Sequence, residues 1–285
     1  MNVIEELKNY ASFGVAGNFT GHLEQAGEAI DFKNIKTSDK NAPKAIFPTY
    51  IKISKKNEII PEFLNDFPFD SNKIIYPENE QNIQLEPECA IFCEIEYKNG
   101  VVEKIIPISF GASNDCSIRK EGAKKISIKK NWGASSKGIS ENFIKIDSFS
   151  ENGIINDYRI ASFLQRDNQI FDYGEDSAVK SYSYIYDQLN KWMIDRLNNQ
   201  QNEGPAEPLN EYLKTADFPS KALFSIGATR YTDFGEHNYL KANDLSIVVL
   251  YPSSKYTNED IKTFLKEKKY TNSDISFLVQ KIVLK

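Results

Sequence analysis

The chain has 285 residues, 40% of them hydrophobic and 26% charged, which is the composition of a folded globular protein. Its 35 Lys and Arg residues against 40 Asp and Glu residues give a net charge of −5. We expect no nucleic-acid partner, because proteins that bind phosphates concentrate positive charge. The longest strongly apolar run, residues 245–251, is far shorter than the roughly 20 residues of a membrane helix, so we expect no membrane partner either.

The cysteines and the first residues of the chain indicate the cellular compartment. Cys89, Cys93 and Cys116 are odd in number and form no CxxC pair, which suits a reducing compartment better than a disulfide framework or a zinc knuckle. Residues 1–10 place acidic residues ahead of any lysine and contain no apolar run long enough for a signal peptide. These features predict a cytoplasmic protein.

The hydrophobic periodicity of the first half predicts more strands than helices. A short helix is expected over residues 3–10 and a buried strand over 13–16, after which Thr20 can cap a helix that contains His22. Residues 31–45 are polar and are predicted to form a loop. Further strands are predicted at residues 45–53, 73–76, 89–97, 101–109 and 125–128.

The second half continues this pattern with two longer helices. Strands are predicted at 143–149, 160–164, 221–226 and 245–251, and helices at 178–197 and 258–268. Residues 198–208 offer almost no apolar side chain to bury, so we expect an exposed insertion at about 198–212. The whole pattern predicts an α+β protein that is mainly β, with a few peripheral helices.

An acidic pair precedes one of the predicted strands. Glu86 and Glu88 are two residues apart, so in an extended chain both carboxylates project from one face and can converge on one hard cation. Two neighbouring carboxylates in a partly buried site repel each other, and a divalent ion lets both stay ionised. The alternative is an exposed acidic strand face, an interpretation that a second pair, Glu94 and Glu96, also fits.

A carboxylate and a guanidinium are expected at the end of another strand. Asp115 follows the apolar segment 105–110, and Arg119 comes four residues later, where it can bind an oxyanion through two hydrogen bonds. Only five of the 35 basic residues are arginines, so an arginine at this position favours a planar contact over a simple positive charge. The alternative is a turn in which Asp115 bonds to the backbone and Arg119 forms a surface ion pair.

Two further residues are candidates for chemistry. Lys137 lies in a loop rich in Gly and Ser, residues 130–138, and can present its ammonium to an anion; a solvated surface lysine is the alternative. His22 is one of two histidines, and a position near a helix N-terminus favours the neutral imidazole, which can act as a base. A local hydrogen-bonding role is the alternative for His22.

In their order along the chain, these segments resemble the fumarylacetoacetate hydrolase superfamily. Its pattern has a G-x-N-[YF]-x-x-H start, P-x-x-F-x-K, an E-x-E pair, N-D-x-[ST]-x-R, a K-G loop and a late L-K-x-G-D. The matching segments are 17–22 (GNFTGH), 43–52 (PKAIFPTYIK), 86–88 (EPE), 114–119 (NDCSIR), 137–138 (KG) and 240–244 (LKAND). The resemblance implies a mixed β-sandwich roll, a single domain over residues 1–285 and a homodimer.

The resemblance also implies a metal centre and a lid. Glu86, Glu88 and Asp115 would be the ligands of Mg²⁺, with Mn²⁺ or Ca²⁺ as alternatives. His22 would lie on a mobile lid, about residues 17–45, and would activate water or relay a proton.

The substrate contacts follow from the same resemblance. Arg119 and Lys137 would hold anionic or carbonyl oxygens of the substrate and take part in catalysis. The late G-T-P element of the pattern is represented by residues 227–229, which makes Thr229 a further substrate contact. Gln25 stands where decarboxylase-like members have a glutamate, with Glu24 and Glu28 nearby, and a glutamine can orient the imidazole but cannot take a proton.

The implied function is a metal-dependent enzyme that acts on a small oxo acid or oxo diacid through a metal-stabilised enolate. Hydrolytic cleavage of a carbon–carbon bond is the leading reaction. Decarboxylation, hydration and tautomerisation pass through the same kind of enolate, so the ligands do not choose among them. A protein that keeps the metal site and binds a ligand without turnover is the alternative from a different class, which Gln25 and the altered segment 227–229 favour.

Overall fold

A computed structural model describes residues 3–33, 35, 37, 39, 41–55, 57–79, 82–120 and 122–285. Within these ranges the larger sheet has eight strands, in the order β2-β1-β13-β6-β7-β9-β3, with β10 also paired to β7. Its strands are β1 (Ala11–Ala16), β2 (Ala45–Ile51), β3 (Phe69–Asp70), β6 (Pro87–Lys98), β7 (Val101–Asn114), β9 (Lys137–Ile139), β10 (Ile144–Lys145) and β13 (Lys221–Ala228). The sheet is mixed: β1 pairs β13 and β3 pairs β9 in parallel fashion, and its other pairs are antiparallel.

A second sheet faces the first, and a separate short ribbon consists of two strands. The second sheet has the order β12-β11-β14-β15-β4 among the described residues. Its strands are β4 (Lys73–Ile75), β11 (Tyr158–Arg166), β12 (Gln169–Ala178), β14 (Leu245–Pro252) and β15 (Ser276–Val283). The ribbon pairs β5 (Ile83–Gln84) with β8 (Ser117–Ile118) in antiparallel fashion.

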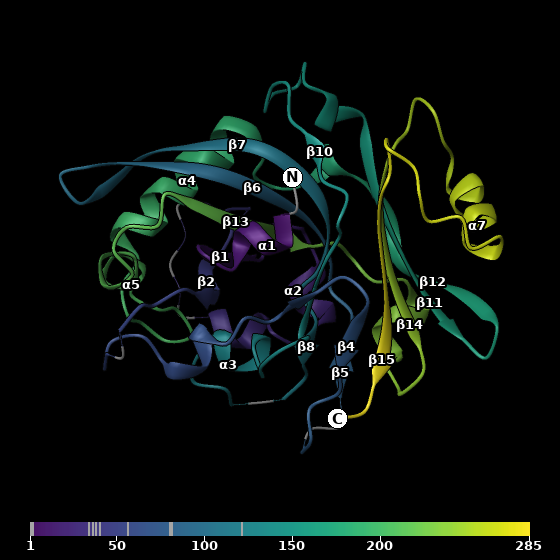
Figure 1. Cartoon of the computed structure of the whole chain (residues 1–285), viewed down its shortest axis with the longest axis horizontal. Helices are drawn as coiled ribbons and strands as arrows, with labels where there is room; N and C mark the ends of the chain where they lie inside the picture. The colour runs from purple at the N-terminus through teal and green to yellow at the C-terminus, as the bar shows by residue number, and fades with distance from the viewer. Residues whose placement is uncertain are drawn as a thin grey trace.

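The helices are short and peripheral. They are α1 (Val3–Leu7), α2 (His22–Gln25), α3 (Ser127–Lys130), α4 (Tyr186–Asn199), α5 (Leu209–Thr215), α6 (Asp233–His237) and α7 (Asn258–Lys266), with 3₁₀ turns η1 (Ala29–Phe32), η2 (Glu62–Asn65), η3 (Ile154–Asp157) and η4 (Val179–Ser181). In Figure 1, β6 and β7 arch over α1 and β1, and α7 lies at the outer side of the second sheet. The predicted α+β, mainly β fold with mixed sheets is confirmed.

The main core lies between the two sheets. It combines Ile91 and Phe110 from the larger sheet with Leu250 and Leu278 from the second. Residues 87–93 of β6 are buried on both faces, which explains why this strand is a nearly continuous apolar run. Such a strand holds the residues at its beginning in a fixed position.

Three of the predicted elements differ from the structure. Residues 125–128 alternate apolar and polar side chains, yet the chain forms α3, and the side chains of Lys129 and Lys130 are buried. The helix predicted from residue 178 begins only at Tyr186, because residues 169–178 form β12 against β11. The long strand predicted at 143–149 is reduced to the two residues of β10.

Within the predicted insertion at 198–212, the continuous exposed stretch is limited to residues 201–204, with Asn199 and Glu211 also exposed. The side chain of Gln200, just before this stretch, is buried and bonds to backbone groups. Gln200 accepts from the Ile46 N–H at 2.9 Å and donates to the Ile46 carbonyl at 2.7 Å. Its amide also donates to the Glu207 carbonyl at 2.8 Å, which closes the turn into α5.

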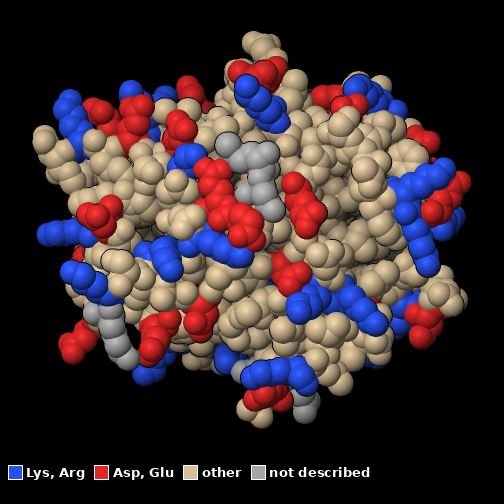
Figure 2. Space-filling model, viewed as in Figure 1, with Lys and Arg blue, Asp and Glu red and all other residues tan. Residues whose placement is uncertain are grey.

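On the face shown in Figure 2, acidic and basic side chains are interspersed and neither sign forms one large area. None of the helices in the described ranges has the length and apolar character needed to cross a bilayer.

Candidate metal centre

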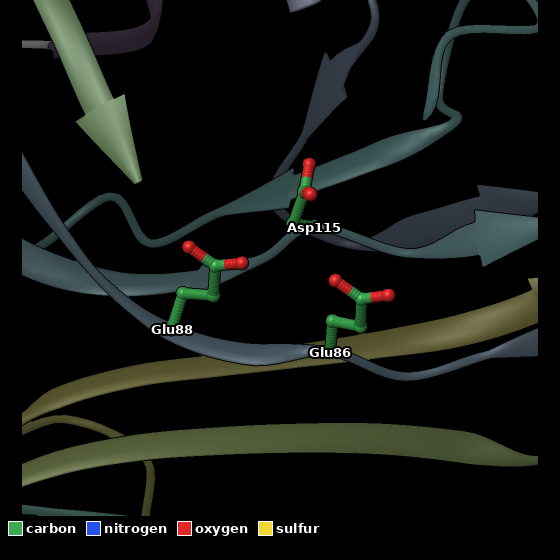
Figure 3. A group of neighbouring side chains, drawn as sticks. All are labelled: Glu86, Glu88 and Asp115. Atoms are coloured by element: carbon green, nitrogen blue, oxygen red, sulfur yellow. The ribbon is translucent and has the colours of Figure 1, made fainter. Parts of the chain in front are cut away.

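Three carboxylates meet where β6 begins and β7 ends. The two strands are antiparallel, with Glu88 opposite Ser113, so the residues before and within the start of β6 lie against the end of β7. The Asp115 N–H donates to the Glu86 carbonyl at 3.0 Å and fixes this approach. One carboxylate oxygen from each of Glu86, Glu88 and Asp115 lies within 4.8 Å of the other two, and all three residues are buried. Figure 3 shows Glu86 and Glu88 on one stretch of chain, with Asp115 on the neighbouring segment.

This donor set fits a hard divalent cation. Opposite ligands of an octahedral magnesium ion lie roughly 4 Å apart, so the three oxygens need only a small movement to share one ion. Of the three carboxylates, Glu88 is the one without a counter-charge within the described ranges. Among the described residues it forms no ion pair; its Oε2 accepts only the Gly227 N–H, at 2.8 Å. Burial, together with Asp115 and Glu86, raises the pKa of Glu88 well above its usual range, and a bound cation would stabilise its ionised form.

The other two carboxylates are paired with cations from the chain. The Lys130 ammonium lies 2.6 Å from Glu86 Oε2 and 2.8 Å from Asp115 Oδ2. Arg119 Nη2 lies 2.7 Å from Glu86 Oε1, and Lys137 Nζ lies 2.6 Å from Asp115 Oδ1. A carboxylate has about four lone-pair positions, so each of these oxygens can still bind an ion.

The pKa values follow this pairing. Burial opposes ionisation of Glu86, but Lys130 and Arg119 outweigh it and hold the pKa of Glu86 well below its usual range. Burial also opposes the charge of Lys130, but Asp115 and Glu86 raise the pKa of its ammonium above the usual range. For Lys137 burial prevails over the attraction of Asp115 and lowers the pKa. Glu86 and Lys130 are therefore held as an ion pair at neutral pH.

His22 lies on α2, which is shorter than predicted and is preceded by Gly21 in the left-handed region (φ 86°), not capped by Thr20. The imidazole is buried against the Tyr231 ring, with 5.1 Å between ring centroids. Within the described part of the chain, neither ring nitrogen has a hydrogen-bond partner. Burial lowers the pKa of His22 to about 4, so the imidazole is neutral at pH 7.

Gln25 does not orient this imidazole. Its carbonyl oxygen accepts from the Tyr231 N–H at 2.9 Å, and its amide donates to the Tyr231 carbonyl and to Glu236 Oε2, both at 3.1 Å. Gln25 therefore joins α2 to the segment between β13 and α6. The proposed contact from Gln25 to the imidazole is wrong.

A small internal cavity of about 20 Å³ joins the lid to the carboxylates. Its polar lining comes from His22, Glu28, Glu86, Glu88 and Lys130. A water molecule needs roughly 10 to 15 Å³ of such space, so the cavity has room for about one water and not for an oxo acid. A larger molecule could reach the carboxylates from this cavity only if the chain around it moved.

The remaining predicted residues lie around this cavity and do not line it. Lys137 is placed behind Asp115, where it also donates to the Cys116 carbonyl at 3.0 Å. Thr229 is buried at the end of β13 with its N–H on the Pro87 carbonyl at 3.1 Å, and the neighbouring Ala228 lines the cavity instead. Arg119 contacts the group of three carboxylates through its ion pair with Glu86.

Sequence reasoning missed Lys129 and Lys130 and gave Glu28 no role. Glu28 Oε1 lies 2.8 Å from Arg119 Nη1 and also 2.8 Å from Lys129 Nζ. The two lysines directly follow the segment 125–128 predicted to be a strand, and among 30 lysines nothing in the local sequence marks them as buried. The only available signal for Glu28 is its position on the lid, six residues after His22.

A family model matches residues 28–282 of the chain and is described as a family of unknown function (DUF5718). The chain belongs to this family. The match covers α3 and all three carboxylates, but it begins after β1 and His22. No curated protein matches the sequence.

Solved structures match the fold of this DUF5718 member. The apo form of 2-keto-3-deoxy-D-arabinonate dehydratase has a TM-score of 0.51 and 12% identity, over 96% of this chain and 73% of that one. A protein named "putative fumarylacetoacetate isomerase/hydrolase" from Oleispira antarctica has a TM-score of 0.51 and 12% identity, over 96% of this chain and 93% of that one. The resemblance to the fumarylacetoacetate hydrolase superfamily is thereby confirmed for the fold.

Proposed function

We propose that the protein is a metal-dependent enzyme that acts on a small oxo acid or oxo diacid, with hydrolytic cleavage of a carbon–carbon bond as the leading reaction. The observation that carries the proposal is the group of three buried carboxylates beside a cavity that a neutral imidazole also lines. An ionised carboxylate that is buried without a counter-charge destabilises the folded protein. This makes Glu88 in particular a candidate ligand for a cation.

The proposal gives each residue a part in the reaction. When bound by Glu86, Glu88 and Asp115, Mg²⁺ or a similar ion would supply a Lewis acid that stabilises negative charge on a substrate oxygen. Lys130 faces the cavity and would hold an anionic substrate oxygen, the part that the sequence assigned to Lys137. His22 is neutral and lacks hydrogen-bond partners among the described residues, so it can take a proton from a water in the cavity.

The fold neighbours support the substrate class. One of them is named a dehydratase of 2-keto-3-deoxy-D-arabinonate, and another a fumarylacetoacetate isomerase/hydrolase, both names of enzymes for oxo acids. Decarboxylation, hydration and tautomerisation remain alternatives on the same residues. The cavity beside His22, with room for about one water, favours the hydrolytic reaction.

A second candidate function is ligand binding without turnover. Two observations favour it: Glu86 is already paired with both Lys130 and Arg119, and Gln25 is bonded to Tyr231 and not to the imidazole. The same metal centre would then hold an acid without changing it. We also propose, as the sequence led us to expect, one domain over residues 1–285 and a homodimer in the cytoplasm.

The test combines metal binding with a substrate screen. Calorimetric titration of the purified protein with Mg²⁺ and Mn²⁺ is expected to give one site, which is lost in Glu88→Gln. Glu94→Gln is the matched control, because Glu94 lies on the same strand and is exposed. The metal-loaded protein is then incubated with acylpyruvates, oxaloacetate and 2-keto-3-deoxy acids, with product formation and carbon dioxide release followed separately.

The outcomes separate the candidates. Cleavage of an acylpyruvate without carbon dioxide release supports the hydrolase, and carbon dioxide release from oxaloacetate supports a decarboxylase. Metal binding without consumption of any of these acids favours the binding protein. A protein that binds neither ion contradicts the metal-dependent proposal.

A further inference from the structure

An open pocket of about 620 Å³ lies on the outer side of the lid. Glu28 lines both this pocket and the internal cavity, so its side chain is part of the wall between them. Arg119 and Lys129 line the outer pocket, together with the exposed side chains of Ile30 and Tyr239. The wall is therefore built from charged groups, and the mouth of the pocket is partly apolar.

The wall has the geometry of a carboxylate-binding site. A single oxygen of Glu28 receives both the Arg119 guanidinium and the Lys129 ammonium, each at 2.8 Å. The three side chains are nearly buried, with exposed fractions of 9%, 8% and 4%. An arginine and a lysine that converge on one carboxylate form strong, charge-assisted hydrogen bonds.

The two cations belong to segments outside the lid, although Lys129 Nζ also lies 3.1 Å from Asp31 Oδ2 within it. Glu28 lies between α2 and η1, within the lid. Arg119 is held by Gln84 Oε1 at 2.6 Å and by Glu86 at 2.7 Å, at the β5–β8 ribbon and the metal centre. Lys129 belongs to α3. If the lid moves, Glu28 leaves with it while the cations stay, and buried cations without a counter-ion are strongly unfavourable.

We propose that Arg119 and Lys129 form a second carboxylate-binding site for the substrate, which Glu28 fills while the lid is closed. The inference rests on the proposed function and narrows the substrate to a short oxo diacid. Its 2-oxo acid end would lie at Glu86, Glu88 and Asp115, and its distal carboxylate would replace Glu28. Exchange of one carboxylate for another keeps the buried charge balanced, so lid opening and uptake of the diacid are coupled.

Arg119 makes the two sites neighbours. Its Nη2 lies against Glu86, one of the three carboxylates, and its Nη1 lies against Glu28. A carboxylate in the place of Glu28 is thus separated from the metal centre by the width of one guanidinium. This separation suits the two ends of a short-chain diacid.

The experiment compares two acids with the same carbon chain, 2-oxoglutarate and 2-oxopentanoate, which differ in the distal carboxylate. Their binding to the magnesium-loaded full chain is measured by calorimetry. The wild-type protein is expected to bind the diacid on the order of tenfold more tightly, as for a hydrogen bond between charged groups. Lys129→Met is expected to reduce this preference to about onefold, and Glu28→Gln to increase it, because the amide carries no competing charge. Lys125→Met, four residues before Lys129 and paired with the carbonyls of Gly204 and Ala206, is the matched control.

Three results overturn the inference and leave the proposed function standing: no preference in the wild type, a preference that survives Lys129→Met, or equal tightening of both acids in Glu28→Gln. The last result would mean that Glu28 only holds the lid closed. If Lys129→Met does not fold, the Glu28→Gln ratio decides, together with a crystal structure of that variant with 2-oxoglutarate. There the distal carboxylate must lie within hydrogen-bond distance of Lys129 Nζ. Failure of the proposed function is distinct, because then neither magnesium nor either acid binds.

Discussion

The ammonium of Lys130 lies 2.6 Å from the carboxylate of Glu86, so a cation from the chain itself faces the ligand set of the candidate metal centre. The same ammonium contacts Asp115 at 2.8 Å. Lys130 therefore has two opposite effects: it keeps the carboxylates ionised and stable when no metal is bound, and it repels an incoming dication.

The substitution Lys130→Met separates these effects. We expect it to lower the melting temperature of the metal-free protein, because Glu86 and Asp115 lose a buried counter-ion. In the same variant the affinity for Mg²⁺ should rise by about tenfold or more, since a repulsive charge is removed at short range. Melting curves with and without magnesium, and calorimetric titration, measure both. Lys125→Met serves as control, and weaker magnesium binding by Lys130→Met would disprove this account of the lysine.

The three carboxylates should differ in their effect on stability. Glu88 has no ion pair among the described residues, so Glu88→Gln is expected to change the free energy of unfolding by no more than about 1 kcal/mol. Glu86→Gln leaves Arg119 and Lys130 facing a neutral amide and should cost roughly 3 to 5 kcal/mol. Urea unfolding of the metal-free variants tests the order. Both variants should lose the metal, and a larger cost for Glu88→Gln would contradict the assigned pairing.

His22 should remain neutral far below its usual pKa. Burial lowers its pKa to about 4, whereas the pKa of the exposed His237 is raised by its bond to the Asp233 backbone. Because these are the only histidines, two imidazole signals in an NMR titration are enough to test this. A His22 signal that titrates near pH 6.5 would mean that the lid leaves the imidazole in water.

The same shift makes the stability of the protein depend on pH. The folded-state pKa of His22 lies below the unfolded value of about 6.5, so the unfolded chain takes up the proton first. The contribution of neutral His22 is fully present above pH 6.5 and is lost as the pH falls toward 4, by roughly 3 kcal/mol in total. His22→Asn should flatten the curve of unfolding free energy in this window, and His237→Asn should not. An unchanged curve in His22→Asn would show that other groups cause the acid sensitivity.

The position of the lid depends on Asn18, which lies at its beginning. The buried Asn18 amide donates to the carbonyls of Tyr184 and Ile226, at 2.9 and 2.8 Å, and its oxygen accepts from the Tyr184 N–H at 2.8 Å. Asn18→Ala leaves these backbone groups unpaired and is expected to destabilise the protein by roughly 3 kcal/mol. It should also increase proteolysis within residues 22–33. If the variant is as stable and as resistant to proteolysis as the wild type, Asn18 does not position the lid.

The convergence of the three carboxylates could be predicted, because it depends on local pattern. Alternating and apolar runs predicted the strands that became β6 and β7, and in an antiparallel pair the start of one strand lies beside the end of the other. Glu86, Glu88 and Asp115 occupy those two positions. The resemblance to a known family added the order of the motifs, which no single motif provides.

The cations around the centre could not be predicted from the sequence. Lys129 and Lys130 follow an alternating run that resembles a strand with solvated lysines, and only the tertiary fold turns it into α3 and buries both side chains. The role of Glu28 could not be predicted either, because its side chain is oriented by Arg119 and Lys129, which are about a hundred residues away in the sequence. Lys137 was expected to contact the substrate, and its neighbour Asp115 instead holds it outside the cavity.

The central claim is that Glu86, Glu88 and Asp115 together hold one divalent cation. The most direct test is a crystal structure of the protein soaked with Mn²⁺, with the anomalous difference map used to locate the ion. The account predicts a single strong peak in contact with an oxygen of each of the three carboxylates. A map without a peak there, with Lys130 still bound to both Glu86 and Asp115 at saturating Mn²⁺, would contradict it.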